Sequence, residues 1–146
     1  MQKLKIKIDL LEQPVPRDDW EGLVKISRLS KIPVCADESV RGLREAARAI
    51  KDGIPVINVK LMKFGVFQAR EIANLARANG VHLMMGGMME SNIAMTAAAH
   101  LASGMGCFKY IDLDTPFFIK DEVKKNPYLS MNGRYDLKSV KTGIGI

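Results

Sequence analysis

The sequence predicts an α/β fold in which short parallel strands alternate with helices. Apolar runs recur along the chain at the spacing of a βα unit, and the run Val56–Leu61 has the composition of a strand buried on both faces. A stripe of apolar residues with helical periodicity follows four of the five runs. Repeated βα units favour a parallel sheet with right-handed crossovers.

The chain divides in order into strand, helix and turn signals. Asp18 or Asp19 is expected to cap the first helix, and Gly53 and Gly80 are expected to lie just past the ends of the second and third. The expected strands lie at 6–12, 32–36, 54–60, 81–86 and 109–116. The helical stripes comprise Leu23, Ile26 and Leu29; Leu43, Ala46, Ala47 and Ile50; Val66, Ala69, Ala73 and Ala76; and Ala94, Ala97, Ala98 and Leu101.

The pattern changes after Pro116. Residues 117–146 carry no helical stripe, but an Asn132–Gly133 pair between two short β-prone runs predicts a two-residue hairpin. We therefore divide the chain into a βα portion, 1–116, and a C-terminal extension, 117–146, that packs on the first portion or on a partner.

Composition excludes several classes of protein. A chain of 146 residues that is 47% hydrophobic and 26% charged is long enough for one globular core. The net charge of +6 comes from scattered basic residues without interleaved aromatics, which argues against nucleic acid as a partner. Cys35 and Cys107 form no CxxC pair, and neither a signal peptide nor a membrane span is evident, so we expect reduced thiols, no membrane partner and a cytoplasmic location.

Every predicted strand ends on a polar or ionisable group. These groups are Glu12, Asp37 with Glu38, Lys60, Glu90, and Asp112 with Asp114. In parallel βα architectures, sites are built at the carboxyl ends of the strands. The alternative for each group alone is an exposed charge, or for Asp112 and Asp114 a strand-end cap before Thr115–Pro116.

The lysine at the end of the most apolar strand is the first candidate for catalysis. Burial disfavours an ammonium group, so Lys60 can be tuned towards a base near neutral pH if acidic groups hold it in place. Lys63 is expected to face solvent. The methionines at 84, 85, 88 and 89 are expected to fill the core, with a flexible substrate wall as the alternative.

Carboxylates from neighbouring strand ends suit Mg²⁺, a hard cation that takes oxygen ligands. We assign Glu12 and Asp37 as metal ligands, and Glu38 a supporting role because it should point to the opposite side of its strand. Two carboxylates are fewer than a dedicated site normally uses.

Five motifs in order together resemble the enolase superfamily. They are Leu11-Glu12-Gln13-Pro14, Ala36-Asp37-Glu38-Ser39, Asn58-Val59-Lys60-Leu61-Met62-Lys63, Met89-Glu90-Ser91 and Asp112-Leu113-Asp114-Thr115-Pro116. More narrowly, they are similar to those of the muconate-lactonizing subgroup and its dipeptide epimerases, which act on L-Ala-D/L-Glu and related dipeptides. The resemblance runs from about Leu10 to the C-terminus.

The resemblance implies a TIM-type (β/α)7β barrel, of which this chain would hold about five strands, equivalent to strands 4–8. It implies that Glu12 and Asp37 bind Mg²⁺, that Lys60 is the acid/base lysine and that Glu90 lies near the enolate. It also implies that Asp112 and Asp114 bind the α-ammonium of a dipeptide substrate.

The chain also departs from the family's pattern. The family's capping domain, its first three barrel strands, its second lysine in a KxK motif and its first metal-binding aspartate have no counterpart in it. Lys3, Lys5 and Lys7 have the KxK spacing, but they precede the fourth-strand motif and cannot be that motif. We therefore expect the C-terminal part of a Mg²⁺-dependent dipeptide epimerase that is incomplete alone, with a homo-oligomer or a complementing N-terminal chain as partner. The alternatives are an enzyme like muconate cycloisomerase or N-acylamino-acid racemase, or a non-catalytic fragment that self-associates through its sheet edges.

Overall fold

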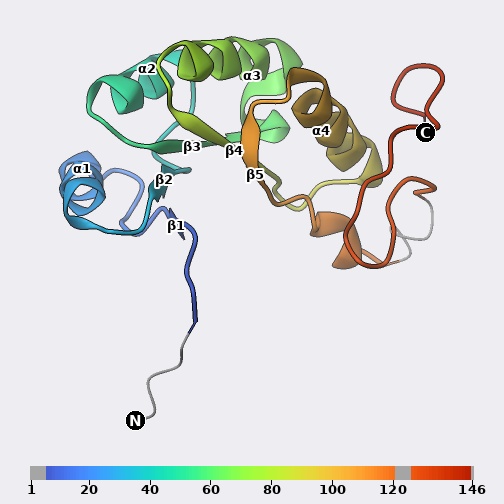
Figure 1. The fold of residues 1–146 in the computed structure, drawn as a ribbon, viewed down its shortest axis with the longest axis horizontal. Coiled ribbons are helices and arrows are strands. Elements are labelled where there is room, and N and C mark those ends of the chain that lie inside the picture. The colour runs from blue at the N-terminus through green and yellow to red at the C-terminus, as the bar shows by residue number, and fades with distance from the viewer. Residues whose placement is uncertain (1–5, 121–125, 146) are drawn as a thin grey trace.

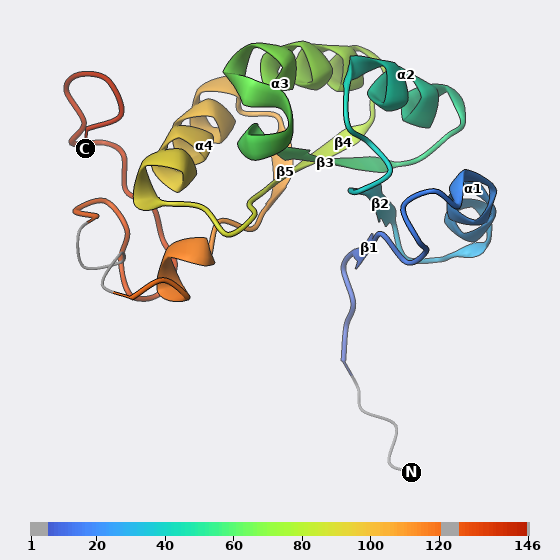
Figure 2. The same cartoon turned by 180° about the vertical axis from the view of Figure 1, so that it is seen from behind.

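The computed structural model describes residues 6–120 and 126–145. It contains one parallel sheet whose strands follow the order β1-β2-β3-β4-β5, in which each strand pairs with the next one in sequence. The strands are β1 (Leu11–Glu12), β2 (Val34–Ala36), β3 (Val56–Lys60), β4 (His82–Gly86) and β5 (Phe108–Ile111). Figures 1 and 2 show this curled half-barrel, which confirms the expected incomplete barrel.

Four helices follow an arc along one side of the sheet (Figures 1 and 2). They are α1 (Trp20–Leu29), α2 (Leu43–Lys51), α3 (Leu61–Ala78) and α4 (Asn92–Met105). Asp19 caps α1 by accepting a hydrogen bond from the Gly22 amide at 2.8 Å, as its position predicts. Gly53, expected after α2, has a φ of 83°, a left-handed conformation that costs glycine little.

The strands at the sheet edges are shorter than predicted. The apolar alternation at 6–12 predicts a long first strand, but only Leu11 and Glu12 pair with β2. An edge strand has one neighbour, so fewer of its backbone groups are bonded. The fifth strand ends at Ile111, and Asp112 and Asp114 therefore lie in the segment just beyond it.

Helix α3 begins earlier than its apolar stripe suggests. It starts at Leu61, immediately after β3, and continues through a kink at Gly65, whose φ is 63°. The short first turn of α3 keeps Lys63 close to the end of β3, and this placement is important for the site.

After β5 the chain forms a 3₁₀ turn over Thr115–Phe117 and then an irregular segment. The chain does reverse at Asn132–Gly133, but the predicted two-residue turn is wrong: the loop has three residues, since the Ser130 amide donates to the Arg134 carbonyl at 2.9 Å and Leu129 pairs with Tyr135. Our expectations for 1–5, 121–125 and 146 lie outside the described residues, and the division at 116 remains a prediction.

Two further expectations can be compared with the described residues. Cys35 and Cys107 are free thiols, as predicted. Met84 and Met85 are buried, but Met88 and Met89 are 46% and 69% exposed, so core filling is wrong for this second pair. None of the helices in the described ranges has the length and apolar character needed to cross a bilayer.

Candidate functional site

Glu12, Asp37 and Lys60 lie on the face of the sheet opposite the helices. The strand residues that pack under the helices include Ile57, Val59, Leu83 and Met85. The opposite, concave face carries a second apolar cluster formed by Cys35, Val56 and Met84. Because side chains alternate between the faces of a strand, residues two or four positions further along share the concave face. Those residues are Asp37, Asn58, Lys60 and Gly86.

Asp37 is the centre of this face. Its carboxylate binds both lysines, with Oδ2 at 2.7 Å from Lys60 Nζ and Oδ1 at 2.7 Å from Lys63 Nζ. The side chain of Asp37 is only 3% exposed, and those of Lys60 and Lys63 are 15% and 14% exposed. One buried carboxylate thus bridges two largely buried ammonium groups.

The three groups shift one another's pKa in different directions. Burial alone would raise the pKa of Asp37, but the charges of Lys63 and Lys60 outweigh burial and lower it. Burial likewise acts to lower the pKa of Lys60, but its bond to Asp37 prevails and raises it. The pKa of Lys60 is thus shifted away from neutrality, so the expectation that burial tunes Lys60 towards a neutral base is wrong for this arrangement.

Lys63 does not face solvent, contrary to our expectation. Besides Asp37 Oδ1, its ammonium donates to the Asp37 carbonyl at 2.9 Å and to the Val40 and Asn58 carbonyls at 3.2 Å each. Burial lowers the pKa of Lys63 and outweighs the opposing effect of Asp37. A cation in the first turn of a helix opposes the helix dipole, and these four acceptors offset that cost. The sequence does hold one signal for this contact: Lys63 lies three residues after Lys60, close to the end of the same strand.

Gln13 holds the loop that follows β2, a role that sequence reasoning missed. Its side-chain oxygen accepts from the Asp37 amide at 2.9 Å and the Ser39 amide at 3.2 Å, and its amide group donates to Ser39 Oγ at 2.8 Å. The backbone of Gln13 has a φ of 34°, which is costly outside glycine. Gln13 follows Glu12 directly, so it links β1 to the loop that presents Asp37.

Glu12 lies on the same face as Asp37, on the neighbouring strand. Its Oε1 accepts a hydrogen bond from Asn58 Nδ2 at 2.7 Å. Partial burial raises the pKa of Glu12, the hydrogen bond from Asn58 opposes this rise, and the like charge of Asp37 adds to it. A divalent cation bound by both carboxylates would remove the repulsion between Glu12 and Asp37.

Asn58 is fully buried beside Gly86 on the next strand. A Cβ at Gly86 would lie 2.6 Å from Asn58 Oδ1, so the absence of a side chain there gives Asn58 its space. Asn58 Oδ1 has no hydrogen-bond partner among the described residues.

The side chain of Glu90 forms a hydrogen bond within its own loop. It is 8% exposed, and its Oε1 accepts from the Met88 amide at 2.9 Å. Glu38 is exposed in the turn after β2, but its charge still favours the protonated form of Lys60. Glu38 therefore acts only at a distance on the Lys60 ammonium.

Asp112 and Asp114 lie beyond β5, on the exposed edge of the sheet. Asp112 is two residues after Tyr110, which packs against the concave cluster. Burial raises the pKa of Asp112, the charge of Asp114 raises it further, and the charge of Lys60 lowers it. Lys60, which bonds to Asp37, therefore also acts electrostatically on the carboxyl group of Asp112.

The residues of this chain fit a metal ion in part. Glu12 and Asp37 supply hard oxygen donors from adjacent strands, but no group of three or more His, Cys, Asp and Glu side chains within 6–120 and 126–145 is placed to hold a metal. A complete coordination shell therefore needs oxygen donors from elsewhere.

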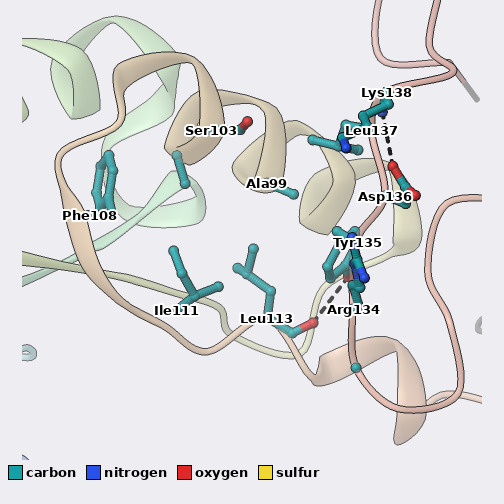
Figure 3. A pocket seen from close by; sticks show the side chains of 12 residues that line it. Ala99, Ser103, Phe108, Ile111, Leu113, Arg134, Tyr135, Asp136, Leu137 and Lys138 are labelled. Carbon is teal, nitrogen blue, oxygen red and sulfur yellow. Dashed lines mark hydrogen bonds between the residues drawn. The ribbon is translucent and has the colours of Figure 1, made fainter.

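One hollow in the described structure lies away from this site. It has a volume of about 600 Å³ and is enclosed by α4, β5 and residues 133–138 (Figure 3). None of the predicted site residues lines it. The candidate site is therefore the open concave face of the half-barrel.

Comparisons with known proteins point to one family. A model of the family described as "Enolase C-terminal domain-like" matches residues 1–146. The hydrophobic dipeptide epimerase of Citrifermentans bemidjiense is 51% identical over 141 residues, a match that covers 94% of this chain and 38% of that relative.

Solved structures show the same relationship. A mandelate racemase/muconate lactonizing enzyme from Roseiflexus sp. has a TM-score of 0.88 and 43% identity, covering 97% of this chain and 41% of the other. A dipeptide epimerase from Enterococcus faecalis, complexed with Mg and the dipeptide L-Leu-L-Tyr, has a TM-score of 0.74 and 39% identity, covering 76% and 32%. The chain thus spans about two fifths or less of the length of these proteins.

Proposed function

Because the chain belongs to the enolase C-terminal domain-like family, we propose that it is the C-terminal part of a Mg²⁺-dependent dipeptide epimerase that needs further barrel strands to act. The observation that carries the proposal is the convergence of Glu12, Asp37 and Lys60 on one face at the carboxyl ends of adjacent strands. In this architecture, that end of the sheet is where active sites are built.

The proposed roles follow from the contacts. Lys60 Nζ holds the proton that is exchanged with the α-carbon of the substrate on one face. Glu12 and Asp37 would hold the cation, which when bound supplies positive charge to the substrate carboxylate as the α-proton leaves. Lys63 and Gln13 fix Asp37 through side-chain and backbone hydrogen bonds, so that its position does not depend on the substrate.

Asp112 and Asp114 are proposed to bind the α-ammonium of the dipeptide. Besides burial, the charge of Asp114 raises the cost of ionising Asp112, and a substrate cation between the two carboxylates would offset that cost. This requirement for a cationic group separates a dipeptide epimerase from the alternatives, an N-acylamino-acid racemase or a muconate cycloisomerase. Asp112→Asn should raise KM for free-amine dipeptides and leave N-acylated ones unchanged; equal loss on both would favour the alternatives.

The test is a chimera in which this chain replaces the matching C-terminal part of the Citrifermentans bemidjiense epimerase. We expect the chimera to exchange the α-proton of L-Ala-L-Glu or L-Leu-L-Tyr in D₂O and to form the epimer with Mg²⁺, and EDTA to abolish both. Lys60→Met should remove the activity at one face, whereas the control Lys51→Met, at an exposed position on α2, should not. A folded chimera without activity would refute the proposal, as would efficient epimerisation by the isolated chain.

A second candidate is a non-catalytic fragment that self-associates. It is favoured by the two edges of the sheet, since β1 pairs only with β2 and β5 only with β4 within the described residues. Unpaired edges invite pairing with another copy. Light scattering of the isolated chain tests this candidate, and a stable monomer across the micromolar range contradicts it.

A further inference from the structure

The segment Asp112-Leu113-Asp114 is held at three backbone positions, one in each residue. The Asp112 amide donates to the Met85 carbonyl at 2.9 Å, and the Asp114 carbonyl accepts from the Phe117 amide at 2.9 Å. Between them, the Leu113 carbonyl accepts from the hydroxyl of Tyr135 at 3.1 Å. The first bond comes from the sheet and the second from the following 3₁₀ turn, but the third comes from the C-terminal segment.

The Tyr135 bond stands out because of where the segment lies. Asp112 and Asp114 follow the last residue of an edge strand, so within the described residues no neighbouring strand holds them on the outer side. The Leu113 side chain is 5% exposed and packs into the core, which turns the aspartates on either side of it outward. Figure 3 shows Tyr135 approaching Leu113 from the C-terminal segment, beside the hollow along α4.

Tyr135 is itself fixed. It forms the antiparallel bridge to Leu129, and the Asp136 amide donates to the Tyr128 carbonyl at 2.8 Å. Asn126, at the start of this segment, donates to Thr96 Oγ1 on α4 at 2.7 Å. A connected path therefore runs from α4 through the hairpin to the Leu113 carbonyl.

The hydroxyl of Tyr135 is suited to a permanent donor role. Burial and the charge of Asp114 raise its pKa to about 12. It therefore keeps its proton, and can donate to the Leu113 carbonyl, throughout the neutral range.

We propose that Tyr135 is a positioning residue for the ammonium subsite, holding the Leu113 carbonyl so that Asp112 and Asp114 face the α-ammonium of a dipeptide together. The inference rests on the proposed function and assigns the C-terminal extension a part in substrate selection. Tyr135 does not touch the substrate; it acts through the backbone between the two aspartates.

The test is Tyr135→Phe in the chimera described above, with Tyr128→Phe as the matched control. Both changes remove one hydroxyl from the same segment, but the Tyr128 hydroxyl donates to the Gly145 carbonyl and not to the aspartate segment. For Tyr135→Phe we expect KM for the free-amine dipeptide to rise about three- to tenfold, as for the loss of one neutral hydrogen bond, with kcat unchanged. Inhibition by the N-acetylated dipeptide should stay the same.

A merely structural role would lower kcat or weaken both ligands equally, and that result would overturn the inference, as would unchanged kinetics. An inactive but folded wild-type chimera would refute the proposed function instead. In that case, a second measurement on the isolated chain tests whether Tyr135 positions the aspartate segment. Amide hydrogen exchange should accelerate at residues 112–117 in Tyr135→Phe and not in Tyr128→Phe, and unchanged exchange there would refute it.

Discussion

The two halves of the candidate site are held in different ways. At the ends of β2 and β3, Asp37 is buried and bonded to two ammonium groups, and Lys63 alone uses four acceptors. At the end of β5, Asp112 and Asp114 are exposed, and single backbone bonds hold their segment. The proposed proton-transfer half is thus preformed by charge in the interior, whereas the proposed ammonium half depends on the sheet edge and the C-terminal segment.

This difference indicates where each half is vulnerable. Buried charges that satisfy one another are costly to separate, because the remaining partner is left without a counter-charge in a poorly solvated place. Exposed carboxylates contribute little to stability, so their substitution should affect ligand binding and leave the fold intact. The predictions below test this division.

The largest effect is expected for Asp37→Asn. The substitution leaves Lys60 and Lys63 close together without their shared carboxylate, and breaking a buried pair in this way costs about 3–5 kcal/mol. Urea denaturation of the isolated chain gives the free energy of unfolding directly. Asp114→Asn is the control from the other half and should change it by less than about 0.5 kcal/mol. Similar losses for both variants would mean that the two halves do not differ.

A smaller loss is expected for Gly86→Ala. The added Cβ would lie 2.6 Å from Asn58 Oδ1 and 2.7 Å from its Nδ2, and the buried Asn58 has little room to move. Overpacking of this kind costs about 1–3 kcal/mol. The control Gly104→Ala, in α4, meets open space and should stabilise the chain by about 0.5–1 kcal/mol.

The cause of the Gly86→Ala effect can be isolated with a second change. Asn58→Ala removes the atoms that the new Cβ would meet, so the double variant should lose less stability than the two single losses added together. Additive losses would show that the space at Gly86 serves another purpose than seating Asn58.

The preformed half of the site was only partly predictable from the sequence. Period-two alternation placed Glu12, Asp37 and Lys60 at strand ends, and the structure brings them to one face because Cys35, Val56 and Met84 mark that face two or four residues earlier. Alternation reports which side of a strand a residue occupies. It does not report what a flexible side chain touches. The sequence pattern therefore assigns Lys63 to solvent, although its side chain reaches Asp37 from the first turn of the next helix.

The ammonium half was less predictable for a related reason. The bond from Tyr135 to Leu113 joins residues 22 positions apart, through a segment without helical or strand periodicity. Similarly, Gln13 reaches the Asp37 amide 24 positions away. Hydrogen bonds between side chains and distant backbone groups leave no periodic trace in a sequence, and they are the contacts that hold the site together here.

The smallest effect is expected for Glu12→Gln, which compares two carboxylates on neighbouring strands. The pKa of Glu12 is raised from its ordinary value of 4.5, so its stabilising contribution is complete below that value and is lost as the pH rises through the raised pKa. The pKa of Asp37 is lowered from 3.8, so its contribution is present above that value and is lost as the pH falls. The two groups should therefore affect stability in opposite directions with pH.

Glutamine keeps the neutral shape of Glu12 and can still accept the hydrogen bond from Asn58. In EDTA, Glu12→Gln should be more stable than the wild type at neutral pH, by less than about 1 kcal/mol for a partly exposed group, and equally stable near pH 4. Urea midpoints across this range measure the difference, and Glu71→Gln, at an exposed position on α3, should show none. If Glu12→Gln is instead less stable than the wild type at neutral pH, the negative charge of Glu12 stabilises the fold without a metal. That result would contradict the repulsion between Glu12 and Asp37 that we use to support a metal site there.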